Sequence, residues 1–340
     1  MLVGLWVTTN CNLKCKYCYE GNDKKKKNMD IATAKQAIAY ILSQYSKLKA
    51  SKLIIQFHGG EPLLNLKIIK FVINELEEKL KENIHNLYFG ITTNGLLLSK
   101  YIIEYMCQKM SYDFSISIDG NESSNDKNRV TLAGEGTYQK VIKNAIDALS
   151  IKPDIRLRMT YDTSNVEELA NNIIHFIELG FKNIVSVPNY YDKKWSDESM
   201  EILLQQMLKV KFHYKDQELP DDLYISILND DFFKKSLCSG GISSFHIMPN
   251  GDIYPCSYGT GNEEFYLGNV KNTPALDIEK VKVLQKISVL ENTECIGCSN
   301  YQSCIGSRCK IVNKVMTDNY TTVMPAICAI ENVKYKFLHF

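Results

Sequence analysis

Residues 2–18 read LVGLWVTTNCNLKCKYC, and this stretch places three cysteines directly after an apolar run. The run is rich in β-branched and aromatic residues, which is typical of a buried β-strand. Cys11, Cys15 and Cys18 follow it, with neither a fourth cysteine nor a histidine close by. Most protein metal sites use four ligands, so the stretch raises the question of what supplies the fourth.

Three simpler interpretations compete with a metal centre of this kind. Disulfides persist mainly in oxidising compartments and usually follow a secretion signal, but the N-terminus has no basic region and only a short apolar run. A structural zinc site would need a distant fourth ligand, the nearest histidine in sequence being His58. Chance clustering of the three cysteines is the third interpretation. No later apolar stretch reaches the roughly 20 residues of a membrane span, so we expect a cytoplasmic protein with reduced thiols and no membrane partner.

The composition is that of a globular enzyme of one or two domains. The 340 residues are 45% hydrophobic and 23% charged, which makes disorder and coiled coil poor explanations. The net charge of +1 provides no bulk field to attract nucleic acid. Cysteine is unevenly spread: of eleven, three lie at 11–18, one at 107 and seven between 238 and 328. This distribution indicates two metal-holding regions separated by a cysteine-poor scaffold.

Short apolar runs alternate with helical patterns up to about residue 190. Leu169, Ile173 and Phe176 show helical spacing, and Gly180 is placed to end that helix. Six strands connected by helices form a parallel sheet, and six such units suit either a doubly wound sheet or part of a (β/α) barrel. The predicted strands are 2–9, 52–59, 87–94, 112–119, 155–162 and 183–189.

Polar and glycine-rich motifs follow the first four predicted strands. The cysteine motif follows the first, GGEP at 59–62 the second, TTNG at 92–95 the third and SIDG at 117–120 the fourth. Any one of these is also an ordinary turn signal. Because parallel strands end at one edge of a sheet, the four motifs together predict a shared site.

The motif CNLKCKYC resembles the CX3CX2C signature of the radical S-adenosylmethionine (radical SAM) superfamily. The resemblance implies a partial (β/α)6 TIM-type barrel and a 4Fe-4S cluster held by Cys11, Cys15 and Cys18. Three thiolates leave one iron of a cubane without a protein ligand, and in this family that iron binds the methionine moiety of the cofactor. The cofactor itself would then be the missing ligand. Reductive cleavage of S-adenosylmethionine gives a 5′-deoxyadenosyl radical that abstracts hydrogen.

Further site residues are carried over from the family position by position. Gly59, Gly60, Glu61 and Pro62 resemble the segment that binds the methionine amine, with Glu61 as the acceptor. Ser117 resembles a serine that contacts the ribose or carboxylate, and Arg129 resembles the arginine that holds the carboxylate. Tyr17 occupies the aromatic position near the expected adenine. For Ser117 and Arg129, ordinary packing roles remain open.

The C-terminal cysteines resemble the SPASM extension of radical SAM enzymes that mature peptides and proteins. The pattern is Cys238-x12-Gly251-x4-Cys256, then a spaced quartet and a trailing cysteine. Four residues separate Cys304 from Cys309, where the family usually has three. We expect an α/β fold with three parts. These are a radical SAM barrel at 1–215, a connecting segment at 216–237 and a small cysteine-rich SPASM domain at 238–340.

In the SPASM family these cysteines hold two auxiliary 4Fe-4S clusters. The resemblance assigns Cys295, Cys298, Cys304 and Cys328 to one cluster, and Cys238, Cys256 and Cys309 to the other. The expected cofactors are therefore three 4Fe-4S clusters and S-adenosylmethionine. The eighth auxiliary ligand would be a non-cysteine group or a substrate thiolate, because Cys107 lies on an apparent helix and is expected in the core. A zinc knuckle, and with it a non-catalytic binding module, is the alternative.

SPASM enzymes mostly act on polypeptides, so the resemblance implies a peptide or protein substrate. Sulfatase-maturing members, which make formylglycine from Cys or Ser, typically have an aspartate after the cysteine of the GX4C segment, and here that position is Ser257. We therefore favour thioether formation, with carbon–carbon cross-linking as a variant. The first strand begins at about residue 2, so we expect leader recognition by a separate protein, by the barrel face or by a short core sequence. An external electron donor such as flavodoxin or ferredoxin is also expected.

Overall fold

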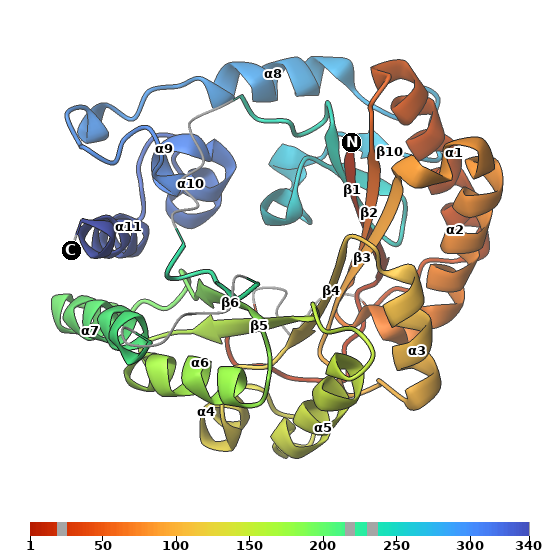
Figure 1. Ribbon diagram of the computed structural model, residues 1–340. Coiled ribbons are helices and arrows are strands. Elements are labelled where there is room, and N and C mark those ends of the chain that lie inside the picture. Colours follow the sequence, from red (N-terminus) through yellow and green to blue (C-terminus); the bar gives the residue numbers. More distant parts are fainter. Residues whose placement is uncertain (19–25, 215–221, 230–236, 340) are drawn as a thin grey trace.

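The protein is represented by a computed structural model that describes residues 1–18, 26–214, 222–229 and 237–339. A curved sheet lies at its centre and helices cover the outer face (Figure 1). The six predicted strands are confirmed, and each is parallel to its neighbours. Their bounds are β1 (Leu2–Thr8), β2 (Leu53–Gly59), β3 (Leu87–Thr93), β4 (Asp113–Ser117), β5 (Arg156–Tyr161) and β6 (Asn183–Pro188).

The outer face of the sheet is apolar and packs against helices. Alternate residues of each strand, such as Val3, Leu5 and Val7 in β1, are buried in one large core. Among the described residues, no helix is long and apolar enough to cross a membrane. The helices on this face are α1 (Ile31–Leu48), α2 (Leu66–Lys79), α3 (Lys100–Lys109), α4 (Glu122–Asn128), α5 (Tyr138–Leu149), α6 (Leu169–Glu178) and α7 (Asp197–His213).

Local signals explain where these helices begin and end. The carboxylate of Asp30 accepts a hydrogen bond from the backbone N–H of Thr33 and caps the start of α1. At the end of α6, Gly180 adopts a φ of +93°, which L-residues rarely tolerate. The N–H of Gly180 bonds to Ile177 and that of Phe181 to Phe176, the pattern of a Schellman motif. The predicted end of this helix is thus confirmed.

The inner face of the sheet is polar. Where one residue of a strand points outward into the core, the next points inward; in β5 the outward residues Leu157 and Met159 alternate with Arg156 and Arg158. The (β/α) barrels of many enzymes fill this space with branched apolar side chains. Here the polar inner face leaves room for a binding site.

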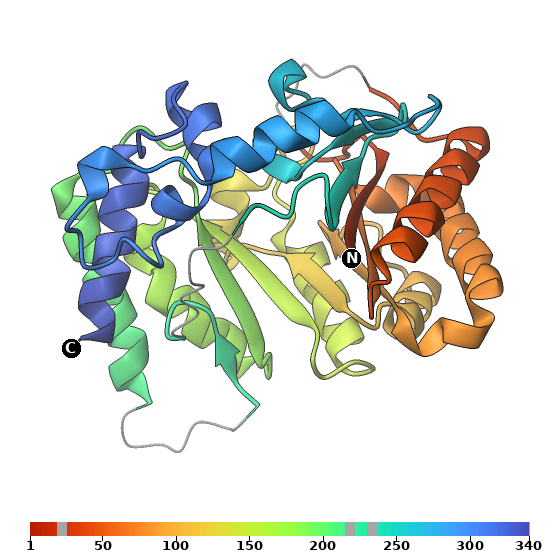
Figure 2. The same cartoon turned by 90° about the horizontal axis from the view of Figure 1, so that it is seen from above.

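The C-terminal part of the chain extends the same sheet. Strand β8 (Ser244–Ile247) pairs in parallel with β1, so the strand order within the described residues is β10-β9-β8-β1-β2-β3-β4-β5-β6-β7. Figure 2 shows this segment, in teal to blue, extending from the strands beside β1 to helix α7. The remaining elements are β7 (Tyr224–Ile225), β9 (Asp252–Tyr254), β10 (Gly268–Asn269), α8 (Ile278–Ser288), α9 (Ile305–Arg308), α10 (Lys310–Thr317) and α11 (Pro325–Leu338).

The two cysteine-bearing regions therefore share one sheet. Helix α11 packs against α7, which fixes the far end of the C-terminal part. The predicted connecting segment, 216–237, lies largely outside the described residues, so the domain boundaries stay predictions. Short 3-10 turns join the elements at η1 (Pro62–Asn65), η2 (Lys81–Asn86), η3 (Val166–Glu168), η4 (Ser257–Gly259), η5 (Glu263–Phe265) and η6 (Thr293–Cys295).

Candidate active site

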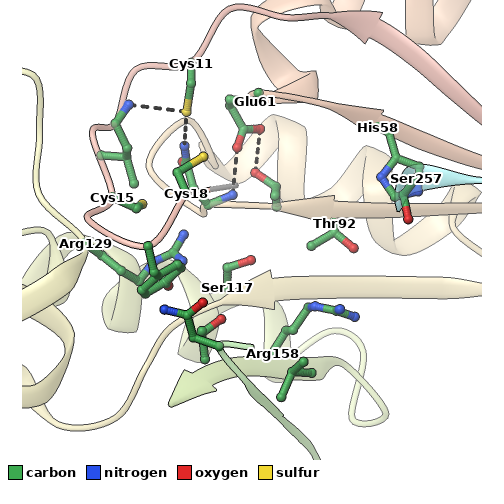
Figure 3. Close-up of a pocket in the computed structure, with 18 of the residues that line it drawn as sticks. Cys11, Cys15, Cys18, His58, Glu61, Thr92, Ser117, Arg129, Arg158 and Ser257 are labelled. Carbon is green, nitrogen blue, oxygen red and sulfur yellow. Dashed lines mark hydrogen bonds between the residues drawn. The ribbon is translucent and has the colours of Figure 1, made fainter. Parts of the chain in front are cut away.

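A cavity of about 380 Å³ opens at the carboxyl ends of the strands, where parallel α/β folds place their binding sites. The motifs that follow β1, β2, β3 and β4 all reach it, as the sequence predicts (Figure 3). Pro62 is buried beside the cavity, and Ser257 and Tyr258 of the C-terminal part line it as well. The predicted site residues in its wall are Cys11, Cys15, Tyr17, Cys18, Gly59, Gly60, Glu61, Ser117 and Arg129.

The cysteine loop is held against the segment that follows α4. The backbone N–H of Lys14 donates to the carbonyl of Val130 at 2.9 Å, and that of Lys16 donates to Asn128 at 3.0 Å. These bonds fix the loop on both sides of Cys15. Since Arg129 lies between the two accepting residues, the loop and the arginine are positioned together.

Two of the three cysteines in this loop, Cys11 and Cys15, are partly buried, whereas Cys18 is exposed. Burial raises the pKa of Cys11 to about 11 and also raises the pKa of Cys15. The Sγ atom of Cys11 accepts a hydrogen bond from the Leu13 N–H at 3.4 Å and one from Asn94 Nδ2 at 3.9 Å. Both thiols are therefore protonated at neutral pH, and a metal that bound them would displace their protons.

The glycine pair allows the end of β2 to pass close to the cysteine loop. A Cβ atom on Gly59 would lie 2.6 Å from the carbonyl oxygen of Thr8, and one on Gly60 would lie 2.5 Å from that of Asn10. Neither position can hold a side chain without moving backbone. The glycines thus bring Glu61 to the wall of the cavity.

Glu61 is fully buried and largely satisfied by its own chain. Its carboxylate accepts hydrogen bonds from the N–H of Leu63 (3.0 Å), the hydroxyl of Thr93 (2.7 Å) and the N–H of Asn94 (2.7 Å). Burial raises its pKa, and these three donors act against that rise. A carboxylate has about four acceptor positions, so roughly one remains for a ligand.

Tyr17 lies between two charged side chains. Its hydroxyl donates to Asp119 Oδ2 at 2.5 Å and accepts from Arg129 Nη1 at 2.7 Å. The other carboxylate oxygen of Asp119 accepts from the N–H of Thr160. Within the described residues, the buried Nε of Arg129 has no hydrogen-bond partner. A buried donor of this kind is costly unless a ligand completes it.

Ser117 is the last residue of β4 and faces the cavity. In the register of the sheet it lies beside Arg158 of β5, so both side chains point to the same face. In the part of the chain that the structure describes, its hydroxyl makes no hydrogen bond to protein. It is thus available to a ligand, although its predicted contact with ribose or carboxylate stays a prediction.

The structure divides the C-terminal cysteines into two groups. Burial raises the pKa of Cys256 to about 12, with added effects from nearby Cys309 and Cys238. These three pack around the small apolar cluster that includes Trp6. Burial likewise raises the pKa of Cys295 and Cys304, and both lie within electrostatic range of Cys328.

With Cys298, which also lies within electrostatic range of Cys295, these groups match the two that the family resemblance implies, while their role as cluster ligands stays a prediction. Among the described residues, no three His, Cys, Asp or Glu side chains converge closely enough to bind one metal ion. Zinc needs its sulfur ligands at about 2.3 Å from a single centre, whereas a cubane distributes its thiolates over four irons. Cys107 is partly buried against the main core, as expected.

Tyr258 connects the cavity with the group Cys238, Cys256 and Cys309. It lines the cavity, packs with the apolar cluster around Trp6, and lies within electrostatic range of Cys309 and Cys256. Burial raises its pKa to about 12, so the phenol stays protonated. The side chain of Tyr258 thus separates the group Cys238, Cys256 and Cys309 from the cavity.

His58 lines the cavity, and the buried rings of Trp6 and His246 pack behind it. The ring of His58 stacks on Trp6, with ring centroids 5.6 Å apart. The indole N–H of Trp6 donates to His246 Nδ1 at 3.1 Å. Burial lowers the pKa of His58 to about 4, assisted by the charge of Arg158, and that of His246 to about 3. Both imidazoles are therefore neutral at physiological pH.

The sequence did not single out several residues of this site. Asn94 belongs to the TTNG motif and Asp119 to the SIDG motif. The position of these motifs after predicted strands could have identified both residues as part of the site. The sequence indicates Arg158 more weakly, because basic residues alternate with apolar ones in RLRMTY at 156–161. His246 and Tyr258 reach the site only through the pairing of β8 with β1, which no local pattern predicts.

Known proteins resemble both parts of the chain. The radical SAM superfamily matches residues 7–207, and the SPASM iron-sulfur cluster-binding domain matches residues 238–309. The uncharacterized protein MJ0907 of Methanocaldococcus jannaschii is 29% identical over 286 residues, which are 82% of this chain and 91% of MJ0907. The radical SAM cyclopropyl synthase TigE of Paramaledivibacter caminithermalis is 25% identical, and the match covers 89% of this chain and 66% of TigE. A cysteine-type anaerobic sulfatase-maturating enzyme of Clostridium novyi is 21% identical, covering 87% and 84%.

Solved structures share the fold. The structure of anSMEcpe with bound AdoMet has a TM-score of 0.81 at 18% identity and covers 99% of this chain and 93% of that one. Streptococcus suis SuiB bound to precursor peptide SuiA has a TM-score of 0.67 at 19% identity, with coverage of 96% and 75%. The two matched domains imply iron–sulfur clusters and S-adenosylmethionine. Because the first of them spans more than half of the sequence, this chain belongs to the radical SAM superfamily of enzymes and carries a C-terminal SPASM domain.

Proposed function

We propose that this enzyme modifies a ribosomal peptide by joining a cysteine sulfur to a carbon of the same peptide as a thioether, with carbon–carbon cross-linking as a variant. Peptide substrates are supported by SuiB, solved with precursor peptide SuiA, and by the sporulation killing factor maturation protein SkfB of Bacillus subtilis, 23% identical over 302 residues. The proposed cofactors are three 4Fe-4S clusters and S-adenosylmethionine.

The residues at the cavity fit the cofactor that the family implies. Cys11, Cys15 and Cys18 lie together on one loop and would hold the first cluster. Arg129 offers a buried guanidinium with an uncompleted Nε, which suits a carboxylate. Glu61 keeps about one acceptor position for an ammonium group. When bound, the cluster and S-adenosylmethionine supply an electron and a 5′-deoxyadenosyl radical that abstracts hydrogen from the substrate.

One observation carries the choice of reaction: the three-cysteine group Cys238, Cys256 and Cys309 adjoins the same cavity through Tyr258. Three thiolates leave one position of a cubane to another ligand, and a substrate thiolate can take it. Ser257 lies in the cavity wall where a sulfatase-maturing enzyme typically has a carboxylate. A serine is a poor base, so this position favours thioether formation over formylglycine formation.

The test uses anaerobically reconstituted enzyme, dithionite, S-adenosylmethionine and cysteine-containing candidate peptides, with products analysed by mass spectrometry. A thioether removes two hydrogen atoms from the peptide and leaves its cysteine unreactive toward iodoacetamide. Formylglycine formation instead replaces the thiol of cysteine with an aldehyde, so the residue exchanges sulfur for oxygen and also loses two hydrogen atoms. Peptides that return unchanged, while a sulfatase-type peptide is converted to formylglycine, would sink the proposal.

A matched pair of variants separates the two cysteine regions. Cys256→Ala should still cleave S-adenosylmethionine but release no cross-linked product, whereas Cys15→Ala should abolish both. Cys107→Ser, which changes a cysteine packed against the main core, should behave as the parent enzyme. We further propose that a flavodoxin- or ferredoxin-type donor replaces dithionite in the cell, and that a separate protein presents the leader peptide.

A further inference from the structure

Arg158 places a positive charge inside the cavity, on the inner face of the sheet. It lies in the middle of β5, beside Ser117 of β4 in the register. Its side chain is solvent-exposed, although it belongs to a central strand, because it points into the cavity. Figure 3 shows it on the same side of the sheet as Ser117 and Thr92.

Within the described residues, no protein group compensates this charge. In the described residues, the Arg158 guanidinium makes neither a hydrogen bond nor an ion pair. Its positive charge acts on His58 and Tyr258, which are both neutral. Of the described residues in the cavity wall, Glu61 is the one carboxylate, and three donors already occupy its oxygens.

The neighbouring arginine shows the contrast. Arg156 lies two residues earlier on the same strand and face, where its Nη1 pairs with Asp113 at 3.1 Å and its Nε donates to Asn183. The chain thus supplies anionic and polar partners for one inward arginine and leaves the next without them. A guanidinium presents a planar fork of donors that matches a carboxylate.

The two cavity arginines also face different sides. Arg129 contacts Tyr17 and lies within range of Cys15, on the side of the cysteine loop. Arg158 acts on His58 and on Tyr258, on the side built by the C-terminal part. Arg129 therefore belongs with the cofactor, and Arg158 faces the space that remains for the substrate.

We infer that Arg158 binds a carboxylate of the peptide substrate and so selects peptides with an acidic group close to the modified residue. The inference rests on the proposed function for its substrate class. The carboxylate can come from an Asp or Glu side chain or from the C-terminus of the peptide. In either case Arg158 determines specificity and orients the peptide.

The test measures binding separately from turnover. Reconstituted enzyme with S-adenosylmethionine, but no reductant, is mixed with short cysteine-containing peptides that differ at one position as Asp, Asn or Lys, each as C-terminal acid and amide. Rapid gel filtration and mass spectrometry give the bound fractions. We expect acidic members to bind at least about tenfold more tightly than neutral ones, and the two arms identify the carboxylate used.

Three substitutions of Arg158 and one of the neighbouring Arg156 test whether Arg158 causes the preference. Arg158→Gln should lose the preference, Arg158→Glu should prefer the Lys peptides, and Arg158→Lys should keep a weaker preference for acids. Arg156→Gln, which removes the paired arginine, should keep the full preference. All variants should retain the affinity of the parent enzyme for S-adenosylmethionine, and circular dichroism should verify their folding.

A wild-type enzyme that binds acidic and neutral peptides equally, or that binds none, overturns the inference. It is equally overturned if the preference survives in Arg158→Gln, or if that substitution weakens cofactor binding and leaves peptide selection unchanged. An acid preference without any mass change after reduction would support the role of Arg158 while the proposed reaction fails. The two proposals are thus separately falsifiable.

Discussion

At the scale of single residues, two glycines on the inner face of the sheet make room for polar side chains. A Cβ atom on Gly4 would lie 2.4 Å from His246 Cε1, and one on Gly90 would lie 2.1 Å from Gln56 Oε1. Glycine weakens a strand and often marks a close approach. The ring of His246 cannot easily move aside, because Trp6 donates to its Nδ1.

We expect Gly4→Ala to destabilise the protein by about 1–3 kcal/mol through overpacking against the imidazole. His246→Ala should remove that clash, so the double variant should lose less than the sum of the single losses. Chemical unfolding of the four proteins under anaerobic conditions measures this coupling. Strictly additive losses would contradict the proposed contact.

The same buried histidines predict how stability depends on pH. Their folded-state pKa values, about 4 for His58 and about 3 for His246, lie below the unfolded value of 6.5. The unfolded chain therefore binds more protons as the pH falls through 6.5, and the folded state loses stability. Relative to the parent protein, His246→Gln should lose about 2 kcal/mol less between pH 7 and pH 5. An unchanged difference between unfolding curves at the two pH values would refute the assignment.

At the scale of elements, the sequence predicts what is local. β-branched runs, helical spacing and the turn at Gly180 identify the six parallel strands and several of their helices. The position of motifs after strands also brings Cys11, Glu61 and Ser117 to one edge. What it misses depends on distant pairing: Ser244 of β8 lies beside Leu2 of β1, and this contact alone brings Tyr258 to the cavity.

Helix α4 offers a test of how an element positions the site. Asn121 caps it by accepting from the N–H of Ser124, and the helix ends directly before Arg129. Asn121→Ala should cost about 1 kcal/mol of stability and should lower S-adenosylmethionine affinity without changing iron content. Asn121→Asp, which preserves the cap, serves as the control. Equal cofactor affinity in Asn121→Ala and the parent enzyme would show that the cap does not support Arg129.

At the scale of the whole molecule, the cavity lies between two cysteine regions that are far apart in sequence. The loop at Cys11–Cys18 forms one side, and Ser257 and Tyr258, beside Cys256 and Cys309, contribute the other. The second cysteine group brings Cys328 close to Cys295 and Cys304. This arrangement predicts three separate clusters in one folded chain.

Metal analysis after anaerobic reconstitution should give about twelve irons per chain with matching acid-labile sulfide. Cys256→Ala should fall to about eight, because two remaining thiolates hold a cubane poorly. Cys107→Ser should keep all twelve, since this cysteine packs against the core of the barrel. About four irons, or mainly zinc, would contradict a three-cluster enzyme.

The pairing of β8 with β1 also affects how the chain folds while it is being synthesised. Trp6 and His246 are 240 positions apart, so β1 must wait for β8, which is synthesised much later. Until then, one edge of β1 presents unpaired N–H and C=O groups, which readily recruit strands from other chains. A fragment that ends near residue 215 would keep that edge open permanently, and we expect it to aggregate. Expression of the barrel alone is therefore a poor route to a simplified enzyme, because the SPASM part completes the sheet as well as carrying cysteines.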